Sequence, residues 1–462
     1  MKSQKIISLN PGKNYEKIGE TNISTRSEID IKISKAHKAK FHWAALGIKE
    51  RKIMLERLYQ EFAKRQHEIQ SLASQEMGMP ISFSKTMDMG AGLKYMRGYL
   101  DYAEEWLAPE TILDTKQEMH QLIFEPIGVA GISIPWNYPF CNFVWGVIQN
   151  LIVGNTVVFK HSEECSLTGK LLEEIVQHVG LPDGVFNQIY GDGSDVGEYL
   201  MNNAIDFLYF TGSTGVGKHL YQVAAKNFIP ALLELGGSAP GIVFEDADLD
   251  AAVESIYDFR FTNSGQSCDG LKRLIVHRSR FDEVVDKLKN LLANKIIGNP
   301  EDPKTDLGPL VAERQLALLE EQVYDALKKG AKIIIGGKRT PGLLGAYYNP
   351  TILTDITFDM RVWNQEIFGP VLPIVPFDSE EEAIALANDT DYGLGGYIYT
   401  KDLDRALIIS RLLQTGNISI NGASYDAPQD SFGGYKDSGL GRENGKEGLR
   451  SFCMKKIVAL KK

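Results

Sequence analysis

GVAGISIPWNYPFCNFVWGVIQNLIVGNTVVFK, residues 128–160, contains two short apolar runs separated by a longer apolar segment. The runs at residues 129–134 and 156–160 predict β-strands, and residues 140–152 predict the helix that joins them. A helix between two short strands forms a βαβ unit, in which both strands lie parallel in one sheet. Such sheets bind nucleotides at the carboxyl ends of their strands, so this segment predicts an α/β fold that can bind a nucleotide.

The same alternation continues on the C-terminal side of this stretch. Further strands and helices are predicted there, the strands at residues 185–190 and 205–211 and the helices at residues 167–179, 195–201 and 216–226. A second α/β run follows Gly237, with strands at residues 241–244, 274–276 and 333–335 and helices at residues 283–295 and 313–329. On the N-terminal side, apolar residues at helical spacing predict an amphipathic helix over residues 50–73 and another around residues 36–43.

The length and the charge of the chain limit its class. A chain of 462 residues is too long for one hydrophobic core, so two or three domains are expected. Its formal net charge of −10 gives no electrostatic reason to bind nucleic acid or an anionic membrane. The most hydrophobic window, residues 140–159, is interrupted by polar residues, whereas a membrane span needs roughly 20 mostly apolar residues. Neither nucleic acid nor a membrane is therefore expected as a partner.

The cysteines favour a reducing compartment. Cys141, Cys165, Cys268 and Cys453 are scattered and form no C-x-x-C pair, which argues against a disulfide framework and a structural zinc site. The first ten residues lack the apolar core of a signal peptide. These features together predict a cytoplasmic protein without a metal.

Three residues are candidates for chemistry. Cys268 follows a small polar turn, residues 263–267, whose backbone N–H groups can help to activate a thiol, although a lone cysteine is also commonly a small buried hydrophobe. Glu234 lies in an apolar run, and burial there raises the pKa of a carboxyl toward the range of a general base; a solvent-facing strand edge is the alternative. Asn137 lies between two proline-containing pairs, where its amide can serve as an oxyanion donor or simply as a turn residue.

Residues 212–219, Gly-Ser-Thr-Gly-Val-Gly-Lys-His, follow a predicted strand and open a helix, so their N–H groups can hold a phosphate. The segment nearly matches the phosphate loop of NTPases, but His219 stands where a Ser or Thr hydroxyl would hold magnesium. A P-loop-like NTPase that uses Gly212 to Lys218 is therefore one alternative. A dinucleotide pyrophosphate needs no such hydroxyl.

Taken together, the motifs resemble those of the aldehyde dehydrogenase superfamily, and the chain looks most like bacterial succinate-semialdehyde dehydrogenases. The similarity runs from about Asn10 to the C-terminus, with the motifs in the family's order and spacing. The motifs that carry it are Pro135-Trp136-Asn137-Tyr138-Pro139, Lys160 with Glu163, Phe210-Thr211-Gly212-Ser213, Glu234-Leu235-Gly236-Gly237, Gly265-Gln266-Ser267-Cys268, Glu366-Ile367-Phe368-Gly369-Pro370, Phe432-Gly433-Gly434-Tyr435-Lys436 and Ser438-Gly439.

The resemblance implies three parts and a self-association. Residues 1–113 and 127–234 would form a Rossmann-like NAD(P)-binding domain, and residues 235–430 an α/β catalytic domain. Residues 114–126 and 431–462 would form a small β oligomerisation element, in which a hairpin-like excursion combines with the C-terminal strand. A sheet edge of this kind is covered by pairing with another subunit, so a homodimer or homotetramer is expected.

The resemblance also implies the reaction. Cys268 would attack an aldehyde to form a thiohemiacetal, with the oxyanion held by the Asn137 amide and the backbone N–H of Cys268. Hydride transfer would leave a thioester that Glu234 hydrolyses through an activated water. Some proteins of this fold have lost such residues and are catalytically silent, but all three are present here.

The resemblance also implies which residues of this chain bind the cofactor and which line the substrate pocket. NAD is favoured over NADP because a carboxylate at Glu163 repels a 2′-phosphate, although Lys160 can compensate. The expected cofactor-binding residues are Trp136, Lys160, Glu163, Gly212, Ser213, Gly217, Leu235, Glu366 and Phe368. The expected substrate pocket comprises Tyr138, Cys141, Trp145, Arg260, Ser267, Asp269 and Tyr425.

Two positions depart from the family's pattern, and one residue bears on the substrate. Gly146 stands where many members have a lysine that helps to relay protons, which puts the route of proton release in doubt. His161 replaces a common proline after Lys160, with little expected effect on binding.

A small aliphatic semialdehyde such as succinate semialdehyde would need a cationic partner, for which Arg260 is the candidate, although Arg260 could equally be structural.

Overall fold

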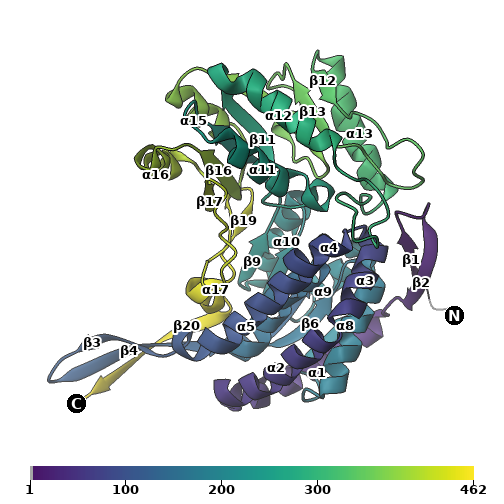
Figure 1. The fold of residues 1–462 in the computed structure, drawn as a ribbon. Helices are drawn as coiled ribbons and strands as arrows, with labels where there is room; N and C mark the ends of the chain where they lie inside the picture. The colour runs from purple at the N-terminus through teal and green to yellow at the C-terminus, as the bar shows by residue number, and fades with distance from the viewer. Residues whose placement is uncertain (1–3) are drawn as a thin grey trace.

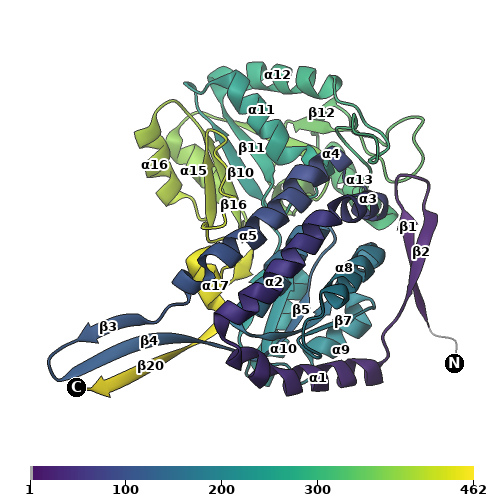
Figure 2. The same cartoon turned by 60° about the horizontal axis from the view of Figure 1, so that its bottom comes forward.

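The structure is a computed structural model that describes residues 4–462, so the first three residues of the expected cofactor domain lie outside it. Two α/β bodies lie against each other, and a narrow β arm projects from one of them (Figure 1). A second view shows helices α2 (Gly47–Lys64) and α5 (Met89–Trp106) running across the surface of the N-terminal body toward the other body (Figure 2). Among residues 4–462, no helix combines the length and the apolar character that a membrane crossing requires.

The N-terminal body is built on a six-stranded sheet in the order β19-β9-β8-β5-β6-β7. Its strands are parallel except for β19, which pairs antiparallel with β9. The residues of β5, β6 and β8 are buried throughout, as expected for strands that are covered on both faces. The strands are β5 (Val129–Ser133), β6 (Thr156–Lys160), β7 (Phe186–Ile189), β8 (Phe207–Thr211), β9 (Ala231–Glu234) and β19 (Gly439–Leu440).

Helices cover both faces of this sheet. The helix predicted over residues 140–152 is present as α6 (Pro139–Phe143), a π-helical turn (Val144–Ile148) and α7 (Gln149–Val153). The other helices of this body include α1 (Arg26–Ala45), α3 (Gln66–Met77), α5 (Met89–Trp106), α8 (Ser166–Val179), α9 (Glu198–Met201) and α10 (Thr214–Asn227).

Two features of the N-terminal region differ from the prediction. The prediction of a single helix over residues 50–73 is wrong, because two helices occupy this region. Helix α2 (Gly47–Lys64) ends just before Arg65, and α3 begins just after it. Arg65 has φ −96° and ψ 14°, outside the helical range, and its guanidinium pairs with Glu68 of the next helix. Before α1, the strands β1 (Lys5–Asn10) and β2 (Glu16–Asn22) form an antiparallel hairpin that no sequence pattern predicted.

The second body contains a seven-stranded sheet in the order β12-β13-β14-β11-β10-β16-β17. Only the β12–β13 pair is antiparallel. Its strands are β10 (Ala239–Val243), β11 (Leu271–His277), β12 (Lys332–Ile335), β13 (Thr351–Thr354), β14 (Val371–Phe377), β16 (Gly395–Tyr399) and β17 (Asn417–Ile420). The main helices are α11 (Leu249–Arg260), α12 (Phe281–Ala293), α13 (Glu313–Lys328), α15 (Glu380–Asn388) and α16 (Leu403–Leu412).

The arm is a three-stranded antiparallel sheet in the order β20-β4-β3. Strands β3 (Glu110–Asp114) and β4 (Glu118–Pro126) form the predicted hairpin, which begins four residues earlier than expected. The C-terminal strand β20 (Cys453–Lys461) lies at one edge and pairs with β4 over its whole length. Short α17 (Gly445–Ser451) leads from the N-terminal body into this strand. The predicted edge strand at the C-terminus is therefore present.

Candidate active site

Cys268 lies on a loop between a short 3-10 turn, Thr262–Gly265, and β11. Asn263 and Ser264 adopt positive φ values of 49° and 53°, so the chain turns sharply before the cysteine. Burial and the adjacent Asp269 carboxylate raise the pKa of the Cys268 thiol well above its ordinary value. The thiol is therefore neutral at physiological pH, and a base must remove its proton before it can attack.

Glu234 is the last residue of β9, and its side chain is 3% exposed. The Ser438-Gly439 segment holds this strand end: Leu235 N–H donates to the Ser438 carbonyl at 2.9 Å, and the Ser438 hydroxyl donates to the Gly236 carbonyl at 2.7 Å. Neither carboxyl oxygen of Glu234 has a hydrogen-bond partner among residues 4–462. Burial and the charge of Glu443 raise the pKa of Glu234 well above its ordinary value, as a general base near neutral pH requires.

Glu443 was not identified from the sequence. Its side chain is 1% exposed, and it accepts a hydrogen bond from the hydroxyl of Tyr209. Burial raises the pKa of Glu443 to about 7, against the opposing effect of that hydrogen bond. Tyr209 also explains the glycine at position 146, because a Cβ there would lie 2.9 Å from a ring carbon of Tyr209. The tyrosine thus packs against the position at which a longer side chain was expected.

Asn137 follows β5 and has its amide held on both sides. Its Nδ2 donates to the Gln266 carbonyl at 3.3 Å, and its Oδ1 accepts from Asn142 Nδ2 at 3.3 Å. The backbone carbonyl of Asn137 accepts from Asn263 Nδ2 at 2.9 Å. These bonds connect the loop after β5 to the turn that precedes Cys268, so the amide and the thiol are fixed relative to each other.

One cavity of about 1140 Å³ joins these side chains. Asn137, Glu234, Cys268 and Glu443 all line it, although they come from four separate parts of the chain. The cavity lies between the two bodies, where the loops at the ends of β5 and β9 meet the loop before β11. The three catalytic candidates from the sequence therefore share one site.

Most of the expected cofactor residues line the same cavity, namely Trp136, Glu163, Gly212, Ser213, Leu235, Glu366 and Phe368. Lys160 and Gly217 lie behind this surface. The Lys160 side chain is 2% exposed, and its ammonium donates to Glu163 Oε2 at 3.1 Å. Gly217 lets α10 pack directly on Leu235. Ser213 begins α10 and its hydroxyl makes no capping bond, so it is available to a ligand.

Glu366 is anchored at the centre of the cavity wall. Its Oε1 accepts from the backbone N–H of Gly237 at 3.0 Å and from Lys272 Nζ at 2.6 Å. Phe368 packs edge-to-face on Trp136, with ring centroids 5.5 Å apart. Lys272, which sequence reasoning did not single out, therefore fixes a residue that was expected to contact the cofactor.

Comparison with known proteins identifies the family of this chain. The model of the aldehyde dehydrogenase family matches residues 1–458. The chain belongs to the aldehyde dehydrogenase family. It is 36% identical over 94% of its length to a succinate-semialdehyde dehydrogenase [NADP(+)] of Deinococcus radiodurans, of which 90% is covered. It is also 36% identical over 99% of its length to an aminoaldehyde dehydrogenase of Pisum sativum and over 93% to a lactaldehyde dehydrogenase of Escherichia coli, covering 92% and 89% of these relatives.

Solved structures confirm the predicted fold of this aldehyde dehydrogenase. A Mycobacterium tuberculosis aldehyde dehydrogenase complexed with NAD+ superposes with a TM-score of 0.94, at 34% identity, covering 99% of this chain and 94% of the other. A Bacillus cereus aldehyde dehydrogenase, also an NAD+ complex, superposes with a TM-score of 0.95 at 31% identity, covering 99% of this chain and 93% of the other.

Three of the seven residues expected in the substrate pocket do not line the cavity. Tyr138, Trp145, Ser267 and Asp269 line the cavity, whereas Cys141, Arg260 and Tyr425 do not. Cys141 is fully buried beneath it, and its backbone N–H donates to Asp88. Tyr425 lies behind Asp269 and donates to its Oδ2 at 3.0 Å.

Arg260 cannot hold a substrate carboxylate from its position in the structure. It is 1% exposed, and its guanidinium donates to the backbone carbonyls of Ile367, Gly369 and Val371. These are residues of the Glu-Ile-Phe-Gly-Pro motif and of β14, so Arg260 supports the loop that carries Phe368. The expectation that Arg260 lines the substrate pocket is therefore wrong, and the structural alternative is correct.

The phosphate-loop alternative gains no support. Lys218, which would contact the phosphates in an NTPase, pairs with Asp437 at 2.5 Å and is not among the residues that line the cavity. His219 faces Glu198, with Nε2 and Oε2 2.8 Å apart. Both side chains thus point away from the cavity lining at Gly212 and Ser213.

Proposed function

We propose that this enzyme oxidises an aldehyde to the carboxylic acid through a thioester on Cys268, with NAD(P) as the oxidant. The observation that carries the proposal is the single cavity that contains Cys268, the Asn137 amide and the unpartnered Glu234 carboxyl. These groups provide the nucleophile, the oxyanion donor and the general base that this chemistry requires.

In the first half of the reaction, Cys268 Sγ forms a bond to the aldehyde carbon. Because burial keeps the thiol protonated, its proton passes to Glu234 as the bond forms, and Glu234 must release that proton toward Glu443 before the second half begins. The aldehyde oxygen becomes an oxyanion that accepts hydrogen bonds from Asn137 Nδ2 and from the backbone N–H of Cys268, a contact whose loss costs roughly 10²–10³ in rate. A nicotinamide held by Glu366 and Phe368 would supply the acceptor for the hydride that leaves the aldehyde carbon.

In the second half, the acyl group leaves Cys268. Ionised Glu234 removes a proton from a water molecule as the water oxygen attacks the thioester carbon, and the C–S bond then breaks to release the acid. The Glu234 proton must next leave a buried site. Glu443, whose pKa is raised to about 7 by burial, is the neighbouring group that can take it, and Tyr209 donates a hydrogen bond to the Glu443 carboxylate before it takes the proton.

The cavity wall fits a dinucleotide, and we propose NAD as the preferred form. Ser213 offers an uncommitted hydroxyl at the start of α10, and Glu366 and Phe368 would flank the nicotinamide ribose. Lys160 and Glu163 would bind the hydroxyls of the adenosine ribose, and the Glu163 carboxylate would repel a 2′-phosphate.

Glu163→Gln tests this preference. Removal of the carboxylate charge should lower the ratio of kcat/KM for NAD to that for NADP by about tenfold, since one favourable or unfavourable charged contact is worth roughly 1.4 kcal/mol or more. Initial rates with both cofactors measure the ratio. Glu174→Gln removes an exposed carboxylate from α8 and serves as the control, and an unchanged ratio in Glu163→Gln would contradict the assignment.

We further propose a small aliphatic aldehyde as substrate and a cytoplasmic location. Three of the relatives are named for succinate semialdehyde, aminoaldehydes and lactaldehyde, whereas others are named for retinal or a pyridine semialdehyde. All four cysteines are free, in keeping with a reducing compartment. Succinate semialdehyde stays within the class, although Arg260 is no longer available as the partner of its carboxylate. Rates with succinate semialdehyde, acetaldehyde, hexanal and benzaldehyde test the class.

The thioester itself is open to direct observation. Glu234→Gln should form the acyl-enzyme more slowly than the wild type, because the thiol proton loses its acceptor, and should hydrolyse it more slowly still. Intact-protein mass spectrometry after prolonged mixing with aldehyde and NAD should therefore show a mass increase of one acyl group. Cys268→Ser should show no adduct and lose nearly all turnover, whereas Cys453→Ser, in the arm, should behave like the wild type. Full turnover of Cys268→Ser would overturn the proposal.

A further inference from the structure

The substrate part of the cavity is lined by carboxylates. Asp269 follows the nucleophile directly, Asp258 lies on α11, and Asp426 lies on the loop after β17; all three line the cavity. Asp269 is oriented by two hydroxyl groups, since Ser267 Oγ donates to its Oδ1 at 2.8 Å and Tyr425 to its Oδ2 at 3.0 Å. The negative charges thus come from three separate segments and face one space.

No ion pair neutralises these charges within the described chain, although the charges of Lys94 and Lys295 act on Asp426 and Asp258 from beyond ion-pair distance. None of the three aspartates lies within ion-pair distance of a Lys, Arg or His side chain of residues 4–462. Burial and the charge of Asp269 raise the pKa of Asp426, and burial and the charge of Glu254 raise the pKa of Asp258. Both shifts mean that burial and neighbouring carboxylates oppose ionisation of these groups, and a positively charged ligand would relieve that cost.

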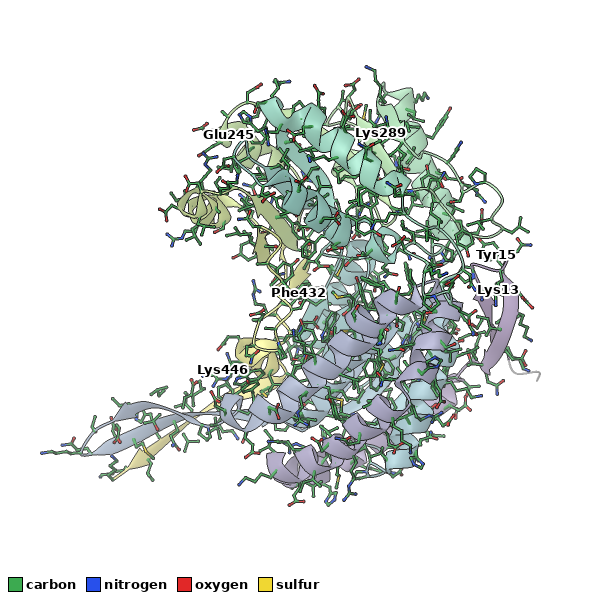
Figure 3. All side chains as sticks on the ribbon, in the orientation of Figure 1. Lys13, Tyr15, Glu245, Lys289, Phe432 and Lys446 are labelled. Atoms are coloured by element: carbon green, nitrogen blue, oxygen red, sulfur yellow. The ribbon has the colours of Figure 1, made fainter. Side chains whose placement is uncertain are left out.

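Aromatic rings lie in the same part of the cavity. Tyr95 and Trp145 meet edge-to-face at 5.5 Å, and Trp145 stacks with Phe432 at 6.3 Å between ring centroids. Phe432 lies on the C-terminal segment that crosses between the two bodies (Figure 3). The face of an aromatic ring attracts an ammonium group, most strongly for tryptophan, so these rings can bind a cation together with the carboxylates.

Basic side chains are scarce in this cavity. Arg314 is the one basic residue among the described residues that line it, and its Nη2 lies 2.5 Å from Glu164 Oε1, on the side of the cofactor residues. Arg260 is committed to backbone carbonyls. A substrate carboxylate would therefore meet three aspartates in the lining, while Lys94, whose charge lowers the pKa of Asp426, is not among the lining residues.

We propose that the enzyme prefers aldehydes that carry a positively charged amine at the end remote from the carbonyl, bound by Asp258, Asp269, Asp426 and the rings of Trp145 and Phe432. This inference rests on the aldehyde oxidation proposed above and specifies the substrate class of the same site. The amine takes no part in the bond changes: the aldehyde carbon loses a hydride to the nicotinamide and gains oxygen from water.

Matched substrates test the preference. The quaternary aldehyde 4-(trimethylammonio)butanal cannot cyclise and keeps its charge at every pH, and 5,5-dimethylhexanal is its neutral isostere. We expect kcat/KM for the cation to exceed that for the isostere at least tenfold, and succinate semialdehyde to be poorer than either. A favourable charge-assisted contact accounts for an effect of this size. Equal values for the isosteric pair, or a preference for succinate semialdehyde, would overturn the inference.

Variants locate the effect. Asp269→Asn and Asp426→Asn should each lower the ratio of kcat/KM for the cation to that for its isostere about tenfold. Asp286→Asn, on the exposed face of α12, removes the same charge outside the cavity and should leave the ratio unchanged. An unchanged ratio in both cavity variants would also overturn the inference. Loss of NADH formation with every aldehyde would instead contradict the proposed oxidation itself.

Discussion

Glu234 and Glu443 are two buried carboxyl groups, and the charge of one opposes the ionisation of the other. Deacylation needs ionised Glu234, so its rate should rise with pH through the raised pKa of that residue. Two interacting carboxyls titrate as a pair, and the observed midpoint belongs to both. Tyr209 biases the pair, because its hydrogen bond lowers the pKa of Glu443 and so favours the negative charge there.

Glu443→Gln should therefore shift the pH–rate profile of deacylation to lower pH. The substitution removes the negative charge that raises the pKa of Glu234, so the base ionises at a lower pH than in the wild type. Single-turnover decay of the acyl-enzyme between pH 5 and 9 measures the midpoint. Glu447→Gln, an exposed glutamate on α17, should leave it in place. A midpoint that stays put or moves to higher pH in Glu443→Gln would show that the two carboxyls do not interact as described.

The sequence predicted the three catalytic candidates because each lies in a local motif with an unusual feature. Cys268 follows a glycine-containing turn, Glu234 interrupts an apolar run, and Asn137 lies between prolines. Glu443 has no such local signal, since its neighbours are ordinary for a loop and its partner Tyr209 is distant in the chain. Arg260 was wrongly assigned to the substrate pocket because it lies near Cys268 in the sequence. Proximity along the chain does not reveal that the Arg260 side chain points toward β14.

At the scale of elements, hydrophobic periodicity predicted the N-terminal sheet well. The strand at residues 156–160 has the predicted bounds, because buried parallel strands are short continuous apolar runs between turns. The β1–β2 hairpin was not predicted because polar and apolar residues are intermixed along both strands, and most of these residues are exposed or partly exposed. Neither face of the hairpin therefore forms an apolar stripe. Strands β13, β14, β16 and β17 were not assigned either, although most of their residues are buried.

Asp88 links two elements at the site, and its burial has a consequence for stability. Its Oδ1 accepts the backbone N–H groups of Phe140 and Cys141, at 3.1 and 2.9 Å, and so caps α6 just after the Asn137 loop. Burial raises the pKa of Asp88 from 3.8 to about 7. Between about pH 4 and 7 the folded chain therefore holds a proton that unfolding releases, so this group makes the free energy of unfolding fall as pH rises, with no further change above pH 7.

Asp88→Asn should remove that contribution while it keeps an oxygen acceptor for α6. The melting temperature of the variant, relative to that of the wild type, should increase as pH rises from 4.5 to 7.5 and then level off. Thermal unfolding followed by circular dichroism across this range measures the difference. Asp88→Ala should lose stability at every pH because two backbone donors are left without a partner. A constant difference between Asp88→Asn and wild type would show that the carboxyl does not titrate in this window.

At the scale of the whole molecule, the arm stands apart from both bodies and exposes apolar side chains. Strand β20 lies at one edge of its sheet, and Met454, Ile457, Val458 and Leu460 are between 42% and 55% exposed. A long exposed edge strand with apolar residues is a surface that proteins usually cover. We propose that a second copy of the chain covers it, in keeping with the self-association that the resemblance implies.

Val458→Asp with Leu460→Asp should therefore yield a folded chain that no longer assembles. The two side chains share one face of β20, because alternate residues of a strand point the same way, and charges there would be costly to bury in an interface. Sedimentation velocity should show the wild type as a dimer or tetramer and the double variant as a single chain with an unchanged melting profile of its two bodies. Phe228→Asp changes a residue that is 97% exposed outside the arm and should assemble like the wild type. A wild-type chain that sediments as a monomer, or a double variant that still assembles, would remove the arm as the site of association.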